Sequence, residues 1–297
     1  MPEGDTIHKI ANFLAPRLGG RLPGILQREQ QQGRVRADLD PSVTALLVLS
    51  PHFVMTGATQ LSQPTSTLTT MVGVWAMLSL RDEDLMRKWI DRGPDSDSDS
   101  MLVTRTVKAY YDGALGSRGA RLLYEYADQP GHRGVSGSGY GFDEELMAEA
   151  MKKGFQVAIH AIGDAGNQVS LDALEAAMAR HPDNPGRHRI EHVQLLHPQD
   201  LSRLAELDLI ASMQPIHATG DMHIADRHWG SRAATGYAWR SLLDAGTHLA
   251  FGSDAPVEPM SPLLGIHAAV TRRRAGPSPV ASWTSVRRSR PPRRGWP

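Results

Sequence analysis

Cysteine is absent from this chain of 297 residues. Without a thiol the chain can form no disulfide framework, no thiolate metal site and no cysteine nucleophile, so metal ligands must come from His, Asp, Glu or Lys. The chain also lacks net charge, because 32 Lys and Arg balance 32 Asp and Glu. This balance gives no general attraction to nucleic acid or to a membrane surface. Histidine, in contrast, occurs 13 times.

Long hydrophobic runs are absent too. No uninterrupted apolar run in the chain is long enough to span a bilayer. The segment Met1 to Thr6 is polar and acidic, which is unlike a secretory signal. We therefore expect a cytoplasmic protein without a membrane partner. The length allows one large domain or two small ones.

The middle of the chain alternates between strand and helix patterns. Apolar runs predict strands over residues 72–80, 101–111, 155–159, 189–193, 209–214 and 247–252. Amphipathic patterns predict helices over 82–90, 142–153, 168–180 and 198–207, and another helix that ends at 241–245. Residues 93–100 are expected to form an acidic surface loop. This alternation favours a parallel sheet with helices outside it, an α/β fold.

Four of the predicted strands lead to residues that can bind a metal or carry a proton: Lys108, His160, His192 and Asp254. A Gly163-Asp164 turn is expected to separate one strand from the following helix. Because the carboxyl ends of parallel strands meet at one edge of a sheet, we expect the four side chains to converge there. A hydrogen-bonded core residue is the alternative interpretation for a single histidine of this kind.

These residue types suit metal-assisted hydrolysis. Neutral imidazole and carboxylate groups are good ligands of first-row divalent metals. A metal can ionise its bound water near neutral pH, and a carboxylate can pass the proton to a leaving amine. We assign His160 and His192 to the metal and Asp254 to proton transfer. Lys108 is a poor ligand as an ammonium, but a carbamate on it would offer two oxygens.

Four motifs resemble those of one known family. They are Val107–Arg118, His160–Asp164, Arg189–His192 and Gly252–Val257. Over residues 72–274 they resemble amidohydrolase family 3, the YtcJ-like metal-dependent hydrolases. The resemblance implies a (β/α)8 barrel, a divalent metal with zinc as first candidate, and hydrolysis of carbon–nitrogen bonds other than peptide bonds in a small amide-like substrate. It makes Lys108 a carboxylated ligand, His160 and His192 the later ligands, and Asp254 a ligand and the general base.

One family motif is missing. The family's first barrel strand ends in His-x-His, and no His-x-His precedes Lys108. We therefore expect an incomplete barrel that lacks two or three strands and two ligands, with exposed strand edges and apolar surface. A truncated, inactive protein is the alternative to an active enzyme. Homo-oligomerisation, which could complete such a barrel, is left open.

Other polar residues near the motifs receive more ordinary interpretations. Asp164 and Glu191 are expected to orient imidazoles or to contact substrate. Arg118 either binds a substrate carboxylate or forms an internal salt bridge. Asp112-Gly113 reads as a turn, and Asp221-Met222-His223 as a loop. We expect surface or loop positions for His217, His223, His228 and His248.

The first residues resemble a different family. Met1-Pro2-Glu3-Gly4-Asp5-Thr6 and the helical pattern after it resemble the start of formamidopyrimidine-DNA glycosylase and endonuclease VIII. In that family the amine of the residue at Pro2 attacks the sugar of a damaged nucleotide, and the residue at Glu3 handles protons. The family's cysteine zinc finger is absent. A DNA glycosylase and AP lyase of base excision repair is thus the alternative function, the only one with a nucleic-acid partner.

Composition divides the chain into four segments. Residues 1–24 form the glycosylase-like helical fragment, 25–71 a junction or linker, and 72–274 the barrel portion. Residues 275–297 are rich in Arg and Pro without an apolar period, which predicts a disordered basic tail. A non-catalytic chimera of two protein fragments is a third interpretation.

Overall fold

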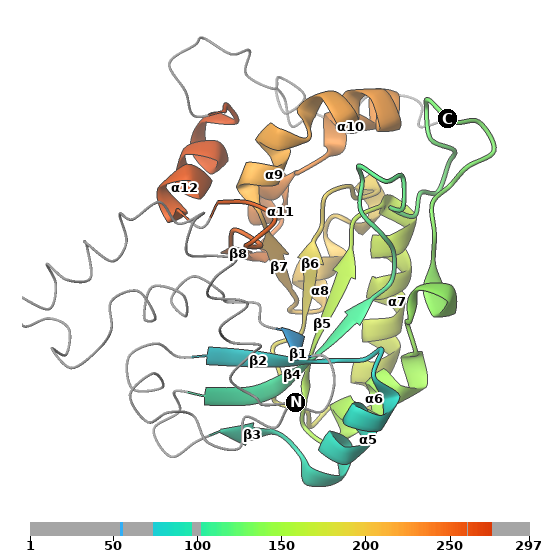
Figure 1. Ribbon diagram of the computed structural model, residues 1–297, viewed down its shortest axis with the longest axis vertical. Coiled ribbons are helices and arrows are strands. Elements are labelled where there is room, and N and C mark those ends of the chain that lie inside the picture. The colour runs from blue at the N-terminus through green and yellow to red at the C-terminus, as the bar shows by residue number, and fades with distance from the viewer. Residues whose placement is uncertain (1–53, 56–73, 97–101, 260, 275–297) are drawn as a thin grey trace, which may run out of the picture.

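The computed structural model describes residues 54–55, 74–96, 102–259 and 261–274. A parallel sheet lies at its centre, with strands in the order β1-β2-β4-β5-β6-β7-β8 (Figure 1). The short β3 pairs antiparallel with β4. The strands are β1 Val54–Met55, β2 Val74–Ser79, β3 Asp95–Ser96, β4 Leu102–Tyr110, β5 Gln156–Ala161, β6 Arg189–His192, β7 Ile210–Met213 and β8 His248–Phe251. Strands that pair in sequential order, all parallel, are the arrangement found in a (β/α)8 barrel.

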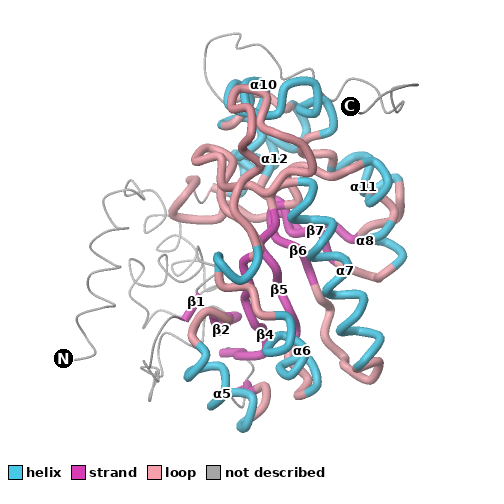
Figure 2. Tube along the Cα trace, turned by 90° about the vertical axis from the view of Figure 1, so that its right-hand side faces the viewer, coloured by secondary structure: helices cyan, strands magenta, loops and turns pink. Residues whose placement is uncertain are grey.

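Helices connect the strands and cover the sheet (Figures 1 and 2). They are α5 Glu83–Arg92, α6 Glu144–Lys152, α7 Asp164–Arg180, α8 Arg203–Glu206, α9 Pro215–Gly220, α10 Met222–Trp229, α11 Trp239–Asp244 and α12 Pro262–Thr271. Three short 3-10 segments occupy Gly137–Tyr140, Pro198–Asp200 and Gly230–Thr235. In Figure 1, α5, α6 and α7 lie on one side of the sheet, and α9 and α10 lie beyond the ends of β5, β6 and β7.

Local sequence explains where the first helices begin. Asp82 accepts a hydrogen bond from the Leu85 amide at 3.0 Å, and Asp143 accepts one from the Leu146 amide at 2.9 Å. Each aspartate thereby satisfies an amide that has no partner inside its helix. The core forms where buried side chains of these helices meet apolar strands, for example at Met147, which is fully buried. The predicted α/β alternation is confirmed for the described residues.

Three local predictions are wrong. Residues 93–100 are not all loop, because β3 pairs with β4 there. Gly163 and Asp164 are not a turn before a helix, since Gly163 caps α7 and Asp164 is its first residue. Residues 221–223 are not a loop but the junction of α9 and α10. At β3, pairing with a strand outweighs the turn preference of small and polar residues, and at the other two sites the helices extend into these residues.

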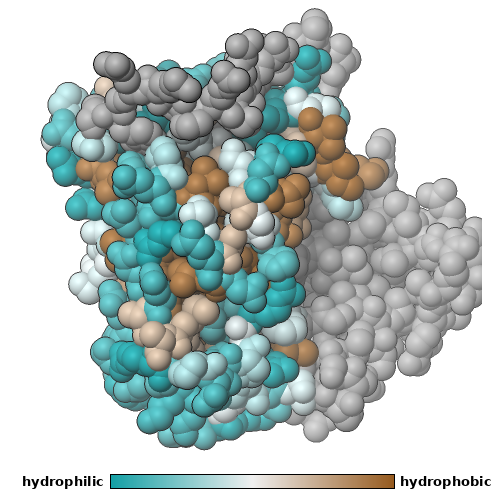
Figure 3. All heavy atoms as spheres, turned by 180° about the vertical axis from the view of Figure 1, so that it is seen from behind, coloured by the Kyte–Doolittle hydropathy of each residue, from teal (hydrophilic) through white to brown (hydrophobic). Residues whose placement is uncertain are grey.

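Several large hydrophobic side chains are exposed near the last strand and helix. They are Phe251, Val257, Leu263, Ile266 and Val270. Hydrophobic residues also stand among hydrophilic ones on the face drawn in Figure 3. In the part of the chain that the structure describes, no helix combines the length and apolar character needed to cross a membrane.

The predictions for both ends of the chain lie outside the described residues. This holds for the helical fragment 1–24, including Pro2 and Glu3, and for the tail 275–297. Of the junction 25–71, only β1 is described. These segment assignments and the lyase hypothesis therefore stay predictions.

Candidate active site

A single cavity at the carboxyl ends of the strands contains the four residues singled out from the sequence. Lys108 comes from β4, His160 from β5 and His192 from β6, and Asp254 follows β8; all four line the cavity. They converge because β4 to β8 run parallel, so their ends reach the same side of the sheet. The expected convergence is therefore observed, whereas the chemical role of each residue stays a prediction.

His192 stands in the middle of this cavity. Its ring lies 4.5 Å from the His160 ring and 6.0 Å from the His217 ring, measured between centroids. Nδ1 of His192 donates to Gln214 Oε1 at 2.8 Å, and the Gln214 amide in turn donates to the Ser212 carbonyl at 3.4 Å. These contacts fix the proton on Nδ1, so Nε2 of His192 carries the lone pair.

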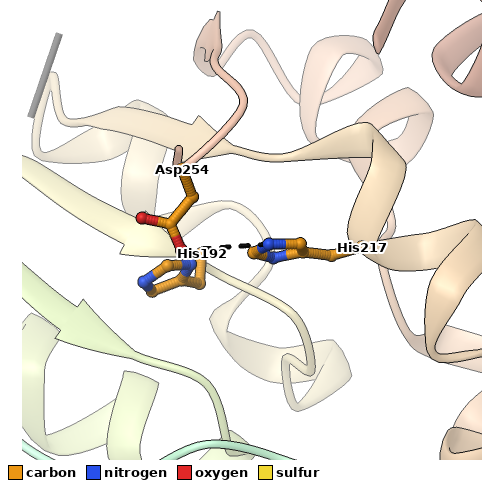
Figure 4. Close-up of side chains that lie close together, drawn as sticks. All are labelled: His192, His217 and Asp254. Carbon is orange, nitrogen blue, oxygen red and sulfur yellow. Dashed lines mark ion pairs between the residues drawn. The ribbon is translucent and has the colours of Figure 1, made fainter. Parts of the chain in front are cut away.

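His217 and Asp254 face each other beside His192 (Figure 4). Nε2 of His217 lies 3.8 Å from Oδ2 of Asp254. His192, His217 and Asp254 each offer one ligand atom, and these three atoms lie within 4.8 Å of one another. His192 and His217 are buried, and Asp254 is partly exposed. A basic nitrogen pair with one carboxylate is a donor set that suits a divalent cation.

On the opposite side, the His160 ring lies next to the carboxylate of Asp112. Nε2 of His160 lies 3.7 Å from Oδ1 of Asp112. Asp112 is not simply part of a turn, as the sequence had indicated. Its fully buried carboxylate accepts hydrogen bonds from the backbone amides of Arg121, Ile162 and Gly163 at 2.8 to 3.0 Å. Burial raises the pKa of Asp112 to about 7, and these backbone hydrogen bonds oppose the rise.

Burial also keeps the two histidines neutral. It lowers the pKa of His160 to about 3, with the nearby Lys108 ammonium adding to the effect. Burial, followed by His160 and Lys108, lowers the pKa of His192 well below its ordinary value. A neutral imidazole is the form that binds a metal. Burial likewise lowers the pKa of Lys108, although Glu191 opposes this, and a less basic lysine is a better nucleophile.

The backbone is strained at two of the site residues. His192 has φ of 79° and Asp254 has φ of 57°, in the left-handed region that residues other than glycine rarely adopt. Val193, next to His192, has φ of 45°, which is more unusual for a β-branched side chain. Such conformations cost of order 1–3 kcal/mol each and tend to collect at functional sites. Here they coincide with the strand ends that form the cavity.

Of the remaining predicted site residues, Glu191 lines the cavity, whereas Asp164 and Arg118 do not. Glu191 lines the cavity and pairs with Arg189, whose Nε lies 2.6 Å from Glu191 Oε1. Asp164 does not line it; its Oδ1 accepts hydrogen bonds from the Leu123 and Ala165 amides. Arg118 also lies outside the lining and forms the internal salt bridge, with Asp128 at 2.7 Å.

The prediction of surface or loop positions is wrong for two histidines. His217 is buried in α9 and lines the cavity, and His228 is buried in α10. The six residues of α9 begin with Pro215 and contain no apolar period, so nothing in that stretch signalled a buried helix. His223 and His248 are exposed, as expected.

Besides His217, sequence reasoning missed three residues that line the cavity: Gln194, Asp221 and Glu258. Gln214 lines it as well, at the end of the strand predicted over residues 209–214, and that strand end was the signal for this residue. Glu258 is half-buried, and burial raises its pKa, followed by the effect of His217, which lowers it. The wall near Asp254 therefore combines carboxylates with an imidazole.

The cavity residues fit a divalent cation on the observations above. His160 and His217 each have a buried Nε2 without a hydrogen-bond partner. Buried polar atoms normally have partners, so such atoms call for an explanation, and an ion is one. The donor set of imidazoles and a carboxylate, with the imidazoles held neutral, supplies that explanation.

Comparison with known proteins agrees with this geometry. A model of the amidohydrolase family matches residues 14–294. YtcJ of Bacillus subtilis (strain 168) is 39% identical over 169 residues, which make up 56% of this chain and 31% of YtcJ. N-substituted formamide deformylase of Arthrobacter pascens is 29% identical over 138 residues, 46% of this chain and 25% of that protein.

A solved structure completes the comparison. An uncharacterized metal-dependent hydrolase from Pyrococcus furiosus matches with a TM-score of 0.58 and 32% identity, over 72% of this chain and 43% of that chain. The parallel sheet with a cavity at its strand ends thus has the fold of the barrel-type metal-dependent hydrolases. Because the family model covers nearly the whole sequence, the chain belongs to the amidohydrolase family. The matched region is less than half of each of these three relatives.

Proposed function

We propose that this chain is a metal-dependent hydrolase that acts on carbon–nitrogen bonds other than peptide bonds in small amide-like molecules. The observation that carries the proposal is the convergence of Lys108, His160, His192 and Asp254 in one cavity. Family membership supports the same reaction class. Similarity to the N-substituted formamide deformylase of Arthrobacter pascens supports an amide-like substrate.

Each cavity residue has its own proposed role. His160, His192 and Asp254 would hold the cation, and Lys108 would join them if carboxylated. A divalent cation there would supply Lewis-acid activation of the substrate carbonyl and of the attacking water. Zinc is our first candidate, since imidazole and carboxylate ligands are typical of catalytic zinc.

Asp254 is the proposed general base. Its carboxylate would take a proton from the attacking water and deliver it to the departing amine. The position of Asp254 suits this role, because the side chain is partly exposed to the cavity while the histidines beside it are buried. Glu191 and Gln194 line the same space and would limit the size and orientation of the substrate.

Asp254→Asn tests the function. Asparagine keeps the shape of the side chain but is a far weaker base, so we expect turnover of an N-substituted formamide or a hydantoin to fall about 10²–10⁴-fold. Asp244→Asn, which makes the same change at an exposed position of helix α11, is the matched control and should keep wild-type turnover. Equal rates for the wild type and Asp254→Asn, including no turnover by either, would contradict the proposal.

A further inference from the structure

We propose that His217 is a metal ligand and that His192, His217 and Asp254 together bind one divalent cation. The inference rests on the proposed function in placing a cation in this cavity. For this cation, His217 of α9, which the sequence motifs did not indicate, takes the place that the proposed function gives to His160. It also divides the cavity into two sides, with His192 between them.

The geometry of the three groups carries the proposal. Their ligand atoms lie within 4.8 Å of one another, and His217 Nε2 is 3.8 Å from Asp254 Oδ2. A tetrahedral zinc ion with bonds of about 2.1 Å holds its ligands roughly 3.4 Å apart. Side-chain rotations that bring the three atoms up to about 1.4 Å closer would therefore complete the coordination.

The His217 nitrogen is well placed for this role. Nε2 is buried, points at Asp254 and has no hydrogen-bond partner. At 3.8 Å the imidazole and the carboxylate are too far apart for a direct hydrogen bond. A cation between them would give Nε2 of His217 a partner, whereas a structural role for His217 would leave this atom without a hydrogen bond in the interior.

The neighbouring Gln194 sets the His217 tautomer. Gln194 Nε2 lies 3.4 Å from His217 Nδ1, and Gln194 Oε1 is buried without a hydrogen-bond partner. A half-turn of this amide exchanges the two atoms. Oε1 then accepts a hydrogen bond from the Nδ1–H group, which leaves the Nε2 lone pair of His217 directed at the cation. Gln214 already holds His192 in the corresponding tautomer, so a glutamine would support each imidazole ligand.

His160 lies on the other side of His192, next to Asp112. The proposed cation therefore needs no donor from β4 or β5. A cation on the His160 side would need Lys108, whose ammonium cannot bind a metal unless it is carboxylated. Removal of His160 should consequently affect binding at the His217 site much less than removal of His217.

Isothermal titration of the full-length chain with Zn²⁺ and with Co²⁺ tests the inference. His217→Asn keeps a polar group that can bond to Gln194 but removes Nε2. Loss of an outer partner of a metal ligand weakens affinity roughly 10- to 100-fold, and loss of a ligand should weaken it by at least as much. His160→Asn removes a nitrogen that the proposed function also assigns to a cation, yet it should weaken affinity at this site much less than His217→Asn does. His228→Asn is the matched control, because His228 is a buried helix histidine 3.4 Å from Asp128 and outside the cavity.

X-ray absorption of the Co²⁺-loaded protein provides a second readout. We expect two imidazole ligands in the wild type and in His160→Asn, and one in His217→Asn. Unaltered affinity and ligand count in His217→Asn would overturn the inference, as would a loss in His160→Asn as large as that in His217→Asn. Should His217→Asn fail to fold, the His160→Asn result still decides, since the inference requires that variant to keep both imidazoles.

The outcome separates this inference from the proposed function. If metal binding depends on His160 and not on His217, the His217 site is wrong while hydrolysis with Asp254 as base can still be correct. If binding follows the inference but Asp254→Asn does not lower turnover, the proposed hydrolytic mechanism is wrong and the metal site stands.

Discussion

At the scale of single residues, the Asp112 carboxylate links three separate parts of the chain. Asp112 follows the end of β4, and its carboxylate accepts hydrogen bonds from the backbone amides of Arg121, Ile162 and Gly163. Two of these amides belong to the segment that joins β5 to α7, directly after His160. The carboxylate thus fixes the backbone that positions His160, besides lying near its ring.

Replacement of Asp112 should therefore be costly for stability. Asp112→Ala leaves three amides without their acceptor, and each buried unsatisfied group costs about 1–3 kcal/mol. We expect a loss of at least about 3 kcal/mol in the free energy of unfolding, measured by urea denaturation. Asp112→Asn keeps one acceptor oxygen and should lose less. Asp183→Ala, on an exposed turn, should change stability by no more than about 0.5 kcal/mol. A similar, small effect of both alanine variants would disprove this account of Asp112.

At the scale of elements, the entry into α7 depends on a close backbone approach. A Cβ at Gly163 would lie 1.9 Å from the carbonyl oxygen of Arg121. No side-chain rotation can relieve this contact, because the opposing atom belongs to the backbone. Glycine is needed at this helix cap for space, not for an unusual φ, since φ at Gly163 is −77°.

Two glycine-to-alanine variants test this requirement. Gly163→Ala should destabilise the protein by about 1–3 kcal/mol or more, as overpacking of a rigid interior does. Gly139→Ala is the control, because a Cβ there meets nothing within 4 Å and alanine restricts the unfolded chain, which adds up to about 1 kcal/mol. Thermal unfolding should show a clearly lower midpoint temperature for Gly163→Ala. The midpoint of Gly139→Ala should stay the same or rise. Equal shifts would show that the close approach does not matter.

The sequence allowed most strands and the location of the cavity to be predicted. An apolar run such as residues 155–159 has few alternatives to a buried strand, and parallel strands present their ends at one edge whatever the details between them. The positions of His160, His192 and Asp254 follow from that rule. Family motifs added the expected barrel, which the comparisons support.

The part of the site formed by α9 could not be predicted in this way. His217 and Asp221 lie in or next to a helix of six residues, which is too short to show a period. The burial of His217 is decided by packing between segments distant in sequence, including α9 against α12. Asp112 was missed for a similar reason, because Asp-Gly favours a turn locally while its three partners lie 9 to 51 residues away.

At the scale of the whole molecule, burial of neutral histidines makes stability depend on pH. His188 is 3% exposed, and its Nδ1 accepts a hydrogen bond from the Val157 amide at 3.0 Å, outside the cavity. Burial lowers its pKa from 6.5 to about 4. The unfolded chain therefore binds a proton at higher pH than the folded chain does, and acid favours unfolding.

The stability that His188 provides should be complete above pH 6.5 and fall as the pH decreases from 6.5 to 4. Below pH 4 both states are protonated and the loss levels off. The difference between the two pKa values corresponds to at most about 3.4 kcal/mol. His188→Asn keeps an acceptor for Val157 but removes the titrating group, so the unfolding free energy of the variant should depend less steeply on pH in this window. Urea denaturation at several pH values measures both slopes, with the exposed His223→Asn as control. Subtracting the variant from the wild type cancels the contributions of His160 and His192, and parallel curves for the two proteins would contradict the assignment to His188.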